Sequence, residues 1–255
     1  AAAHNSGGKV IFQVRGKVPR HSMKAREVRI PAALVDAVVV DATQRQGYDL
    51  VYDAALSGQD RRDDPEPPQP AFSSRLVIAR RAQQELHDNA VINFGFGIPD
   101  QIAKLIDRDG HAERYFQTIE HGTYGGRLMD GDLFGYAMNP SCMIDGPSQF
   151  DFYSGGGLDI AFLGFGEIDA AGNVNVSKLA GNTVGPGGFI DIAQNARKVV
   201  FCGTFDTGGA RLETGDGTLR VTSHGRIPKL VEKVDQITFS GPQASVQGQH
   251  VIYVT

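Results

Sequence analysis

The sequence of 255 residues predicts an α/β fold, in which an open and mostly parallel sheet is flanked by helices. Amphipathic helical segments alternate with short apolar strands from residue 72 onward. The strand predicted at Leu158–Phe165 is apolar at most positions, as strands covered on both faces are. Glycine accounts for 32 residues and gathers in clusters that suit tight turns between strands and helices. After residue 205 the chain is expected to be richer in β structure.

Composition and charge exclude several classes of protein. The chain is 41% hydrophobic and 21% charged with a formal net charge of −4, which excludes a disordered polyelectrolyte. Binding of nucleic acid through bulk positive charge is not expected, and no apolar run approaches the ~20 residues that span a membrane. Cys142 and Cys202 stand in no metal-binding spacing, so we expect two reduced core thiols in a cytoplasmic protein and no metal site.

Residues 1–71 are predicted to hold two short strands and a linker. Lys9–Val14 and Leu34–Val40 are rich in β-branched residues, which favours strands. The cationic residues between them are interpreted as a solvated face in preference to a phosphate-contacting patch. They are Arg15, Lys17, Arg20, Lys24, Arg26 and Arg29. Residues 57–71 combine charge with closely spaced prolines, which cannot donate to a strand ladder, and are predicted to form a linker.

The elements predicted after the linker follow from periodicity and turn residues. They are, in order, a helix from Ser73 or Ser74 to about His87, a strand at Ala90–Phe94, a helix from Pro99, strands at Tyr115–Glu120 and Leu158–Phe165, a short alternating segment at Gly172–Ser177, a helix at Phe189–Lys198, a strand at Val199–Phe205 and a strand at Val251–Thr255. The last strand has no later segment to pair with, and the chain begins without Met. We therefore expect a piece of a longer protein.

Gly95 and Glu120 each stand at the carboxyl end of a predicted strand. Ligands of parallel sheets bind outside these ends, so we expect both residues on one edge. The stretch Gly95–Pro99 follows a strand and opens a helix, and its backbone amides suit a phosphate or a pantetheine amide. A plain tight turn is the alternative. The stretch is an incomplete dinucleotide fingerprint, because Asp100 stands at the third glycine position.

Two further features are candidates for chemistry. Glu120 is interpreted as a surface residue, a helix-capping partner or an exposed nucleophile. Gly187 and Gly188 precede a helix, where free amides suit an oxyanion, and a flexible capped turn is the alternative. Motifs of serine hydrolases and of zinc peptidases are absent from the sequence, so neither chemistry has support.

Several segments together form a recognisable order along the chain. They are Asn5–Gly8, Val77–Ala82, Val91–Pro99, Thr118–Gly122 with Gly125 and Gly126, Gln149–Tyr153 with Gly155–Asp159, Gly172–Ser177, Gly187–Ala196 and Phe201–Phe205. In this order they resemble the class I coenzyme A transferases, specifically the fused single-chain type that acts on short-chain acyl-CoA esters of acetate, ketoacids or propionate. Each motif is weak alone, but the order is specific and covers nearly the whole chain.

The resemblance implies that Glu120 is the nucleophile of a ping-pong reaction. Its glutamyl-CoA thioester would carry CoA from an acyl-CoA to an acceptor acid, in the metabolism of short-chain fatty acids or ketone bodies. The resemblance also implies CoA contacts for seven residues and a weaker supporting donor role for Asn175. The CoA contacts are Gly95, Phe96, Gly97, Ile98, Pro99, Gly187 and Gly188. CoA would be a substrate, with no tightly bound cofactor.

The resemblance also divides the chain. Residues 1–56 match the tail of a first CoA-transferase domain, 57–71 the linker, and 72–255 a C-terminally truncated second domain with the glutamate. The missing N-terminal half is expected to supply much of the acid pocket, and a homo-oligomer is expected. Ser154 stands where the family often has an acid. Two alternatives stay open: an acyl-CoA hydrolase on the same scaffold, and a non-catalytic ligand-binding module related to sugar-phosphate isomerase folds.

Overall fold

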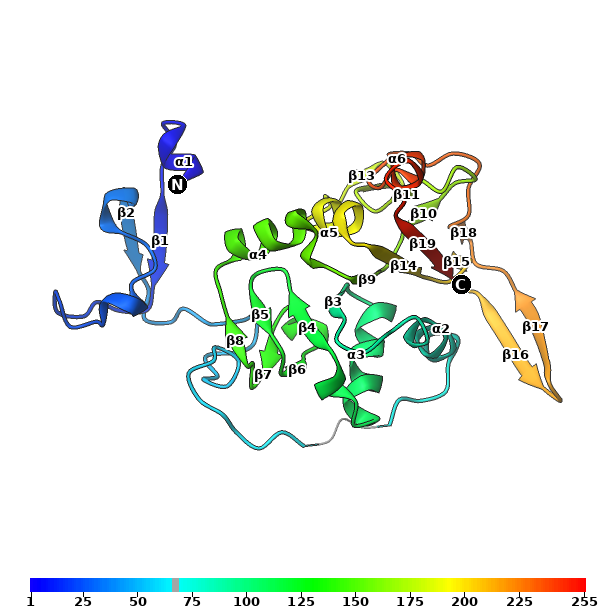
Figure 1. Ribbon diagram of the computed structural model, residues 1–255, viewed down its shortest axis with the longest axis horizontal. Coiled ribbons are helices and arrows are strands. Elements are labelled where there is room, and N and C mark those ends of the chain that lie inside the picture. The colour runs from blue at the N-terminus through cyan, green and yellow to red at the C-terminus, as the bar shows by residue number, and fades with distance from the viewer. Residues whose placement is uncertain (66–68) are drawn as a thin grey trace. The chain divides into compact units, whose positions relative to one another are not determined.

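The computed structural model describes residues 1–65 and 69–255, which form two compact units, 1–53 and 54–255 (Figure 1). In the first unit, strand β1 (Ile11–Val14) pairs in parallel with β2 (Ala37–Val40). Both strands fall within predicted segments. This unit also contains helix α1 (Ala2–Asn5), and the cationic residues between the strands are all exposed, as expected of a solvated face.

The domain boundaries inferred above stay predictions. Part of the predicted linker, residues 66–68, lies outside the described residues. Just before it, Ala55 and Leu56 are buried within the second unit.

The second unit is built on one sheet with the strand order β19-β14-β9-β3-β4-β5-β8, as far as the chain is described. The strands are β3 (Val91–Phe94), β4 (Phe116–Ile119), β5 (Thr123–Tyr124), β8 (Cys142–Met143), β9 (Ile160–Leu163), β14 (Lys198–Cys202) and β19 (His250–Val254). Pairing is parallel from β19 to β4, and antiparallel from β4 to β8. The predicted mostly parallel sheet is therefore confirmed. The last strand does have a partner, because β19 pairs with the earlier strand β14.

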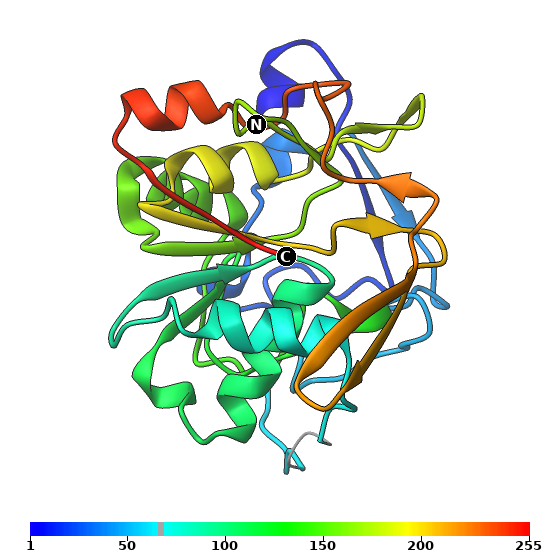
Figure 2. The same ribbon diagram turned by 90° about the vertical axis from the view of Figure 1, so that its right-hand side faces the viewer.

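Helices cover both faces of this sheet (Figures 1 and 2). On one face lie α2 (Ser74–Gln83) and α3 (Ile98–Arg108), and on the other α4 (Gly146–Phe152), α5 (Phe189–Asn195) and α6 (Gly241–Val246). Ser73 caps α2 as predicted, because its Oγ accepts the Leu76 N–H at 3.2 Å. Two helices end earlier than predicted. The helix expected to reach His87 ends at Gln83, and the one expected to reach Lys198 ends at Asn195.

The second unit also contains short antiparallel strand pairs outside the main sheet. They are β6 (Arg127–Leu128) with β7 (Ala137–Met138), β10 (Glu167–Ile168) with β11 (Val174–Asn175), β12 (Lys178–Leu179) with β13 (Asn182–Thr183), β15 (Asp206–Thr207) with β18 (Ile227–Pro228), and β16 (Arg211–Gly215) with β17 (Thr218–Ser223). The last two pairs follow β14, which confirms the β-rich C-terminal part. The β16–β17 pair forms a projecting hairpin (Figure 1).

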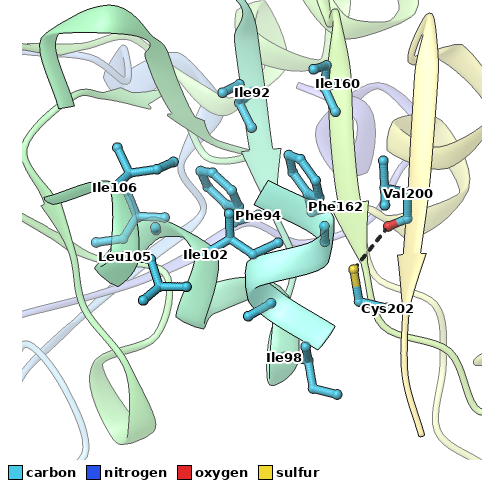
Figure 3. Close-up of a cluster of buried hydrophobic side chains, with 14 of the residues drawn as sticks. Ile92, Phe94, Ile98, Ile102, Leu105, Ile106, Ile160, Phe162, Val200 and Cys202 are labelled. Atoms are coloured by element: carbon cyan, nitrogen blue, oxygen red, sulfur yellow. Dashed lines mark hydrogen bonds between the residues drawn. The ribbon is translucent and has the colours of Figure 1, made fainter. Parts of the chain in front are cut away.

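Alternation along the central strands divides the core into two clusters, one on each face of the sheet. Ile92 and Phe94 of β3 join the cluster under α2 and α3, shown in Figure 3, whereas Asn93 between them faces the other side. Cys202 is buried in that cluster, but Cys142 is exposed on β8. The prediction of two core thiols is therefore wrong for Cys142, because its short strand lies at the edge of the sheet.

No helix in the part of the chain that the structure describes combines the length and the apolar composition that crossing a bilayer requires.

Candidate active site

The two sequence candidates at strand ends lie at the same edge of the sheet. Gly95 follows β3 and Glu120 follows β4, and these strands are parallel neighbours in the register Val91 to Phe116. Their carboxyl ends therefore meet, as expected. Within β4, Ile119 faces the α3 side, so by alternation Thr118 and Glu120 belong to the face covered by α4.

The glycine stretch beside β3 is held closely against the next strand. Gly95 donates its N–H to the Phe162 carbonyl oxygen at 2.8 Å, and a Cβ on Gly95 would lie only 3.2 Å from Leu163 Cδ2. Gly97 has a φ of 98°, a conformation that favours glycine. Its N–H donates to Asp100 Oδ2 at 3.0 Å. Asp100, which stands at the third glycine position of the incomplete fingerprint, thus orders the start of α3. Burial raises the pKa of its carboxyl group.

Glu120 is half-buried in a tight turn between β4 and β5. Gly122 closes this turn by donating its N–H to the Ile119 carbonyl oxygen at 2.9 Å, with a φ of 104°. A Cβ on Gly122 would overlap the carbonyl oxygen of Ile144. The turn therefore requires glycine two residues after Glu120, and it presents the carboxylate from a hairpin rather than from the start of a helix.

Gly187 and Gly188 directly precede α5, as predicted. Within the described residues, no carbonyl or side-chain oxygen accepts a hydrogen bond from either amide. A Cβ on Gly188 would lie 2.9 Å from the ring of Phe150, and the Phe150 ring lies 6.1 Å from that of Tyr153. Packed aromatic rings thus connect the glycine loop to the face on which Glu120 lies.

Asn175 has its hydrogen-bonding groups engaged elsewhere. Its Nδ2 donates to Glu167 Oε2 at 2.7 Å and to the Lys178 carbonyl oxygen at 2.6 Å, and its Oδ1 accepts the N–H groups of Ser177 and Lys178. The side chain is completely buried. In this structure Asn175 orders the chain after β11 and has no free N–H for a reacting carbonyl, so its donor role stays a prediction.

Two cations that the sequence analysis missed lie beside the glycine stretch. Arg75 Nη2 lies 3.5 Å from the position that a Cβ on Gly97 would take. Lys229 Nζ donates to the Phe165 carbonyl oxygen at 3.4 Å, just after β9. Burial and the charge of Arg75 both lower the pKa of Lys229. Two positive charges near backbone amides favour an anion. No spacing in the sequence links them, because Arg75 lies in the first turn of α2 and Lys229 follows β18.

A separate cavity of about 560 Å³ lies on the α3 side of the sheet and does not include Glu120 in its lining. Asp107 of α3 lines it together with Gln117 of β4. Burial raises the pKa of Asp107 to about 6. Oδ2 of Asp107 and Oε1 of Gln117 are buried without a hydrogen-bond partner among the described residues.

Among residues 1–65 and 69–255, no three His, Cys, Asp or Glu side chains gather closely enough to hold a metal ion.

No family model matches the chain. Over 255 residues it is 41% identical to the acetate CoA-transferase YdiF of Escherichia coli O157:H7, covering 100% of this chain and 48% of that protein. It is also 41% identical over 262 residues to the caffeate CoA-transferase of Acetobacterium woodii, covering 100% and 50%. The chain therefore spans about half the length of the curated relatives it matches.

The crystal structure of the YdiF apoenzyme from Escherichia coli O157:H7 has the same fold, with a TM-score of 0.86 and 40% identity over 99% of this chain and 47% of that one. A second structure of YdiF is a thioester complex with CoA, with the same TM-score of 0.86. Similarity of this strength extends along the whole sequence and the whole fold. The chain belongs to the class I coenzyme A transferase family.

Proposed function

We propose that this chain carries the nucleophile of a CoA-transferase, Glu120, which moves CoA from a short-chain acyl-CoA to an acceptor carboxylic acid. One observation carries the proposal. Glu120 lies on a tight turn at the carboxyl edge of the sheet, next to the strand that leads into Gly95–Pro99. The chain is also similar over its whole length to proteins named as CoA-transferases.

The reaction has two half-reactions, the first with the acyl-CoA donor and the second with the acceptor acid. The Glu120 carboxylate attacks the thioester carbonyl of the donor, which forms an acyl-glutamyl anhydride and releases CoA thiolate. The thiolate then attacks the glutamyl carbonyl, which forms a glutamyl-CoA thioester and releases the donor acid. An acceptor carboxylate attacks this thioester, which forms a new acyl-glutamyl anhydride and releases CoA thiolate. The thiolate then attacks the acyl carbonyl of this anhydride, which forms the new acyl-CoA and restores the Glu120 carboxylate. The thioester complex of YdiF with CoA supports an intermediate of this kind.

The free amides of Gly187 and Gly188 are proposed to stabilise the oxyanion that each attack creates. Such donors act best where water is excluded and where their positions are fixed before the reaction. The packing of Gly188 against Phe150 supports this role, because it orders the glycine loop from the side of α4.

The edge between β3 and β9 is proposed to bind CoA. Gly95–Pro99 would lie along the pantetheine chain, with close backbone approach made possible by the two glycines. Arg75 and Lys229 would contact phosphate groups of the nucleotide part, since Arg75 lies beside Gly97 and its charge reaches Lys229. Phosphate contacts of this kind supply affinity without affecting the reacting carbonyl.

A second half, of the kind present in the relatives, is proposed to complete the acid pocket and to select the acids exchanged. We call this chain together with that half the full-length protein. A homo-oligomer of the full-length protein is also proposed. The names of the relatives, an acetate and a caffeate CoA-transferase, support carboxylic acids as the acceptor class.

The direct test is mass spectrometry of the full-length protein incubated with acetyl-CoA or acetoacetyl-CoA, followed by peptide mapping. We expect a CoA adduct on the peptide that contains Glu120, and its loss when acetate is added. Steady consumption of acyl-CoA by water without an adduct would establish a hydrolase instead. Binding of CoA with neither adduct nor turnover would indicate a ligand-binding module.

A further inference from the structure

A chain of buried hydrogen bonds runs beneath the Glu120 turn. The Tyr153 hydroxyl lies 2.6 Å from Thr118 Oγ1, and Thr118 Oγ1 donates to the Ile92 carbonyl oxygen at 2.8 Å. Because a threonine hydroxyl has one proton, Thr118 accepts from Tyr153. Asn93 Nδ2 in turn donates to the Tyr153 hydroxyl oxygen at 3.4 Å. The phenol is therefore the central member of a chain that joins β3 to β4.

All three side chains are shielded from solvent. Tyr153 is 0% exposed, and Asn93 and Thr118 are each 1% exposed. Thr118 stands two residues before Glu120 on the same face of β4. The charge of Glu120 also reaches the phenol, because it contributes, after burial, to raising the pKa of Tyr153. The phenol thus stays protonated at neutral pH and remains a donor.

The position of Tyr153 is fixed by the segment that carries it. Tyr153 begins the irregular π-helical turn Tyr153–Gly157 directly after α4, in which Gly156 has a φ of 86°. Such turns are rare and frequently occur at functional sites. Its ring lies 6.1 Å from that of Phe150 and 6.3 Å from that of Phe152. A Cβ on Gly157 would overlap the Phe152 ring, so only glycine allows this arrangement. The closely packed turn Tyr153–Gly157 therefore holds the Tyr153 hydroxyl in place beside β4.

We propose that Tyr153 is a positioning residue that holds the Glu120 turn at a fixed distance from the Gly95–Pro99 loop. Asn93 immediately precedes the end of β3, from which the loop departs, and Thr118 immediately precedes the end of β4, from which Glu120 departs. The phenol bonded to both side chains sets the spacing of the two strand ends. The inference rests on the proposed function, since it takes Glu120 as the nucleophile.

Removal of the Tyr153 hydroxyl takes one hydrogen bond from each of two buried polar groups while the ring still fills its place. Thr118 Oγ1 loses its donor and keeps only its bond to the Ile92 carbonyl oxygen. Asn93 Nδ2 keeps only its 3.5 Å bond to the Thr118 carbonyl oxygen. Both losses favour a shift of the strand ends. A displacement of about 1 Å at a reacting group lowers a rate by up to about a hundredfold. The variant removes none of the groups proposed to contact CoA, so we expect the displacement of Glu120 relative to the loop to slow the reaction without weakening CoA binding.

The test compares Tyr153→Phe with the wild-type full-length protein. The first readout is the single-turnover rate at which acetyl-CoA produces the CoA adduct on the Glu120 peptide, and the second is CoA affinity by calorimetry. We expect the rate to fall about ten- to a hundredfold, with CoA affinity unchanged within about twofold. The matched control is Tyr253→Phe, which removes a hydroxyl that donates to the Gly172 carbonyl oxygen at 3.0 Å, and it should keep the wild-type rate.

A second pair of variants covers the case in which Tyr153→Phe fails to fold. Thr118→Ser keeps the hydroxyl and should retain most of the wild-type rate of adduct formation. Thr118→Val has the same shape without the hydroxyl, and its rate of adduct formation should be much lower. Equal rates in the two, or a wild-type rate in Tyr153→Phe, would overturn the positioning role alone. A wild-type protein that forms no adduct at all would overturn the proposed function and this inference together.

Discussion

Ile144 donates its backbone N–H to the carbonyl oxygen of Gly122 at 2.8 Å, and the Ile144 carbonyl oxygen fills the place of a Gly122 side chain. The segment before α4 is thus pressed directly against the turn that presents Glu120. We expect Gly122→Ala to destabilise the protein by about 3 kcal/mol or more, since both the positive φ and the overlap oppose a methyl group.

Gly110 provides the matched control for this variant. It has a φ of 68°, but a Cβ there would meet nothing within 4 Å. Gly110→Ala should cost only about 1 kcal/mol, the cost of the backbone conformation alone. Melting temperatures of both variants measure the difference, and similar losses in the two would contradict the close contact at Gly122.

Replacement of Glu120 tests the nucleophile itself. Glu120→Ala in the full-length protein is expected to abolish CoA transfer, because no other group on the turn can form the thioester intermediate. Folding and CoA binding should persist, since Glu120 is half-buried and forms no part of the hydrophobic clusters. Transfer rates between acetyl-CoA and a second acid, with calorimetry for CoA, provide the readouts. Transfer within a few-fold of the wild-type rate would remove Glu120 from the mechanism.

The proposed phosphate contacts of Arg75 and Lys229 predict a kinetic defect that depends on whether the substrate carries the nucleotide part of CoA. Arg75→Gln should raise the KM for acetyl-CoA about tenfold, because one of the proposed charge-assisted phosphate contacts is lost. It should leave the KM for acetyl-pantetheine, which has no nucleotide, unchanged. Arg45→Gln is the control, since Arg45 is exposed in the first unit. An equal defect with both substrates would show that Arg75 supports the loop rather than the phosphates.

Asp107 predicts a pH dependence of stability. Its folded pKa is about 6 against a usual value of 3.8. Between these values the folded protein holds a proton that the unfolded chain has lost, so stability falls as pH rises through this window and stays low above it. Asp107→Asn should therefore raise stability by about 3 kcal/mol at pH 7.5, with the gain nearly vanishing towards pH 4. Melting curves across this range decide, with exposed Asp132→Asn as the control.

The central strands could be predicted from the sequence because their pattern is strong. Ile160–Leu163 is buried at every position, as expected of a strand covered on both faces. The end of α2 could not be predicted, since residues 84–87 contain no helix breaker. The chain turns away at Asn89, whose φ of 61° is specified by the approach to β3 rather than by local preference. The antiparallel strands β5 and β8 were missed because strands of two residues show no periodicity.

The candidate site likewise contains residues that could be predicted from the sequence and residues that could not. Glu120 and the glycine loops could be proposed because each stands next to a strand or helix end that local patterns reveal. Arg75, Lys229 and Tyr153 could not, because tertiary packing alone brings them to the edge of the sheet. Cys142 was misplaced for a related reason, since its exposure depends on the position of β8 at the edge of the sheet and not on the residue type.

The hairpin that presents Glu120 also has a consequence for the order in which the chain assembles. Its register pairs Thr118 with Tyr124 and Ile119 with Thr123, so the contacts that shape it are nearly adjacent in sequence. Loops this short close in well under a microsecond and hairpins form within about 10 μs. The amides of Gly187 and Gly188 come much later in the chain. We therefore expect the Glu120 turn to form early during folding, whereas its proposed oxyanion donors arrive only when the long-range parallel strands have paired.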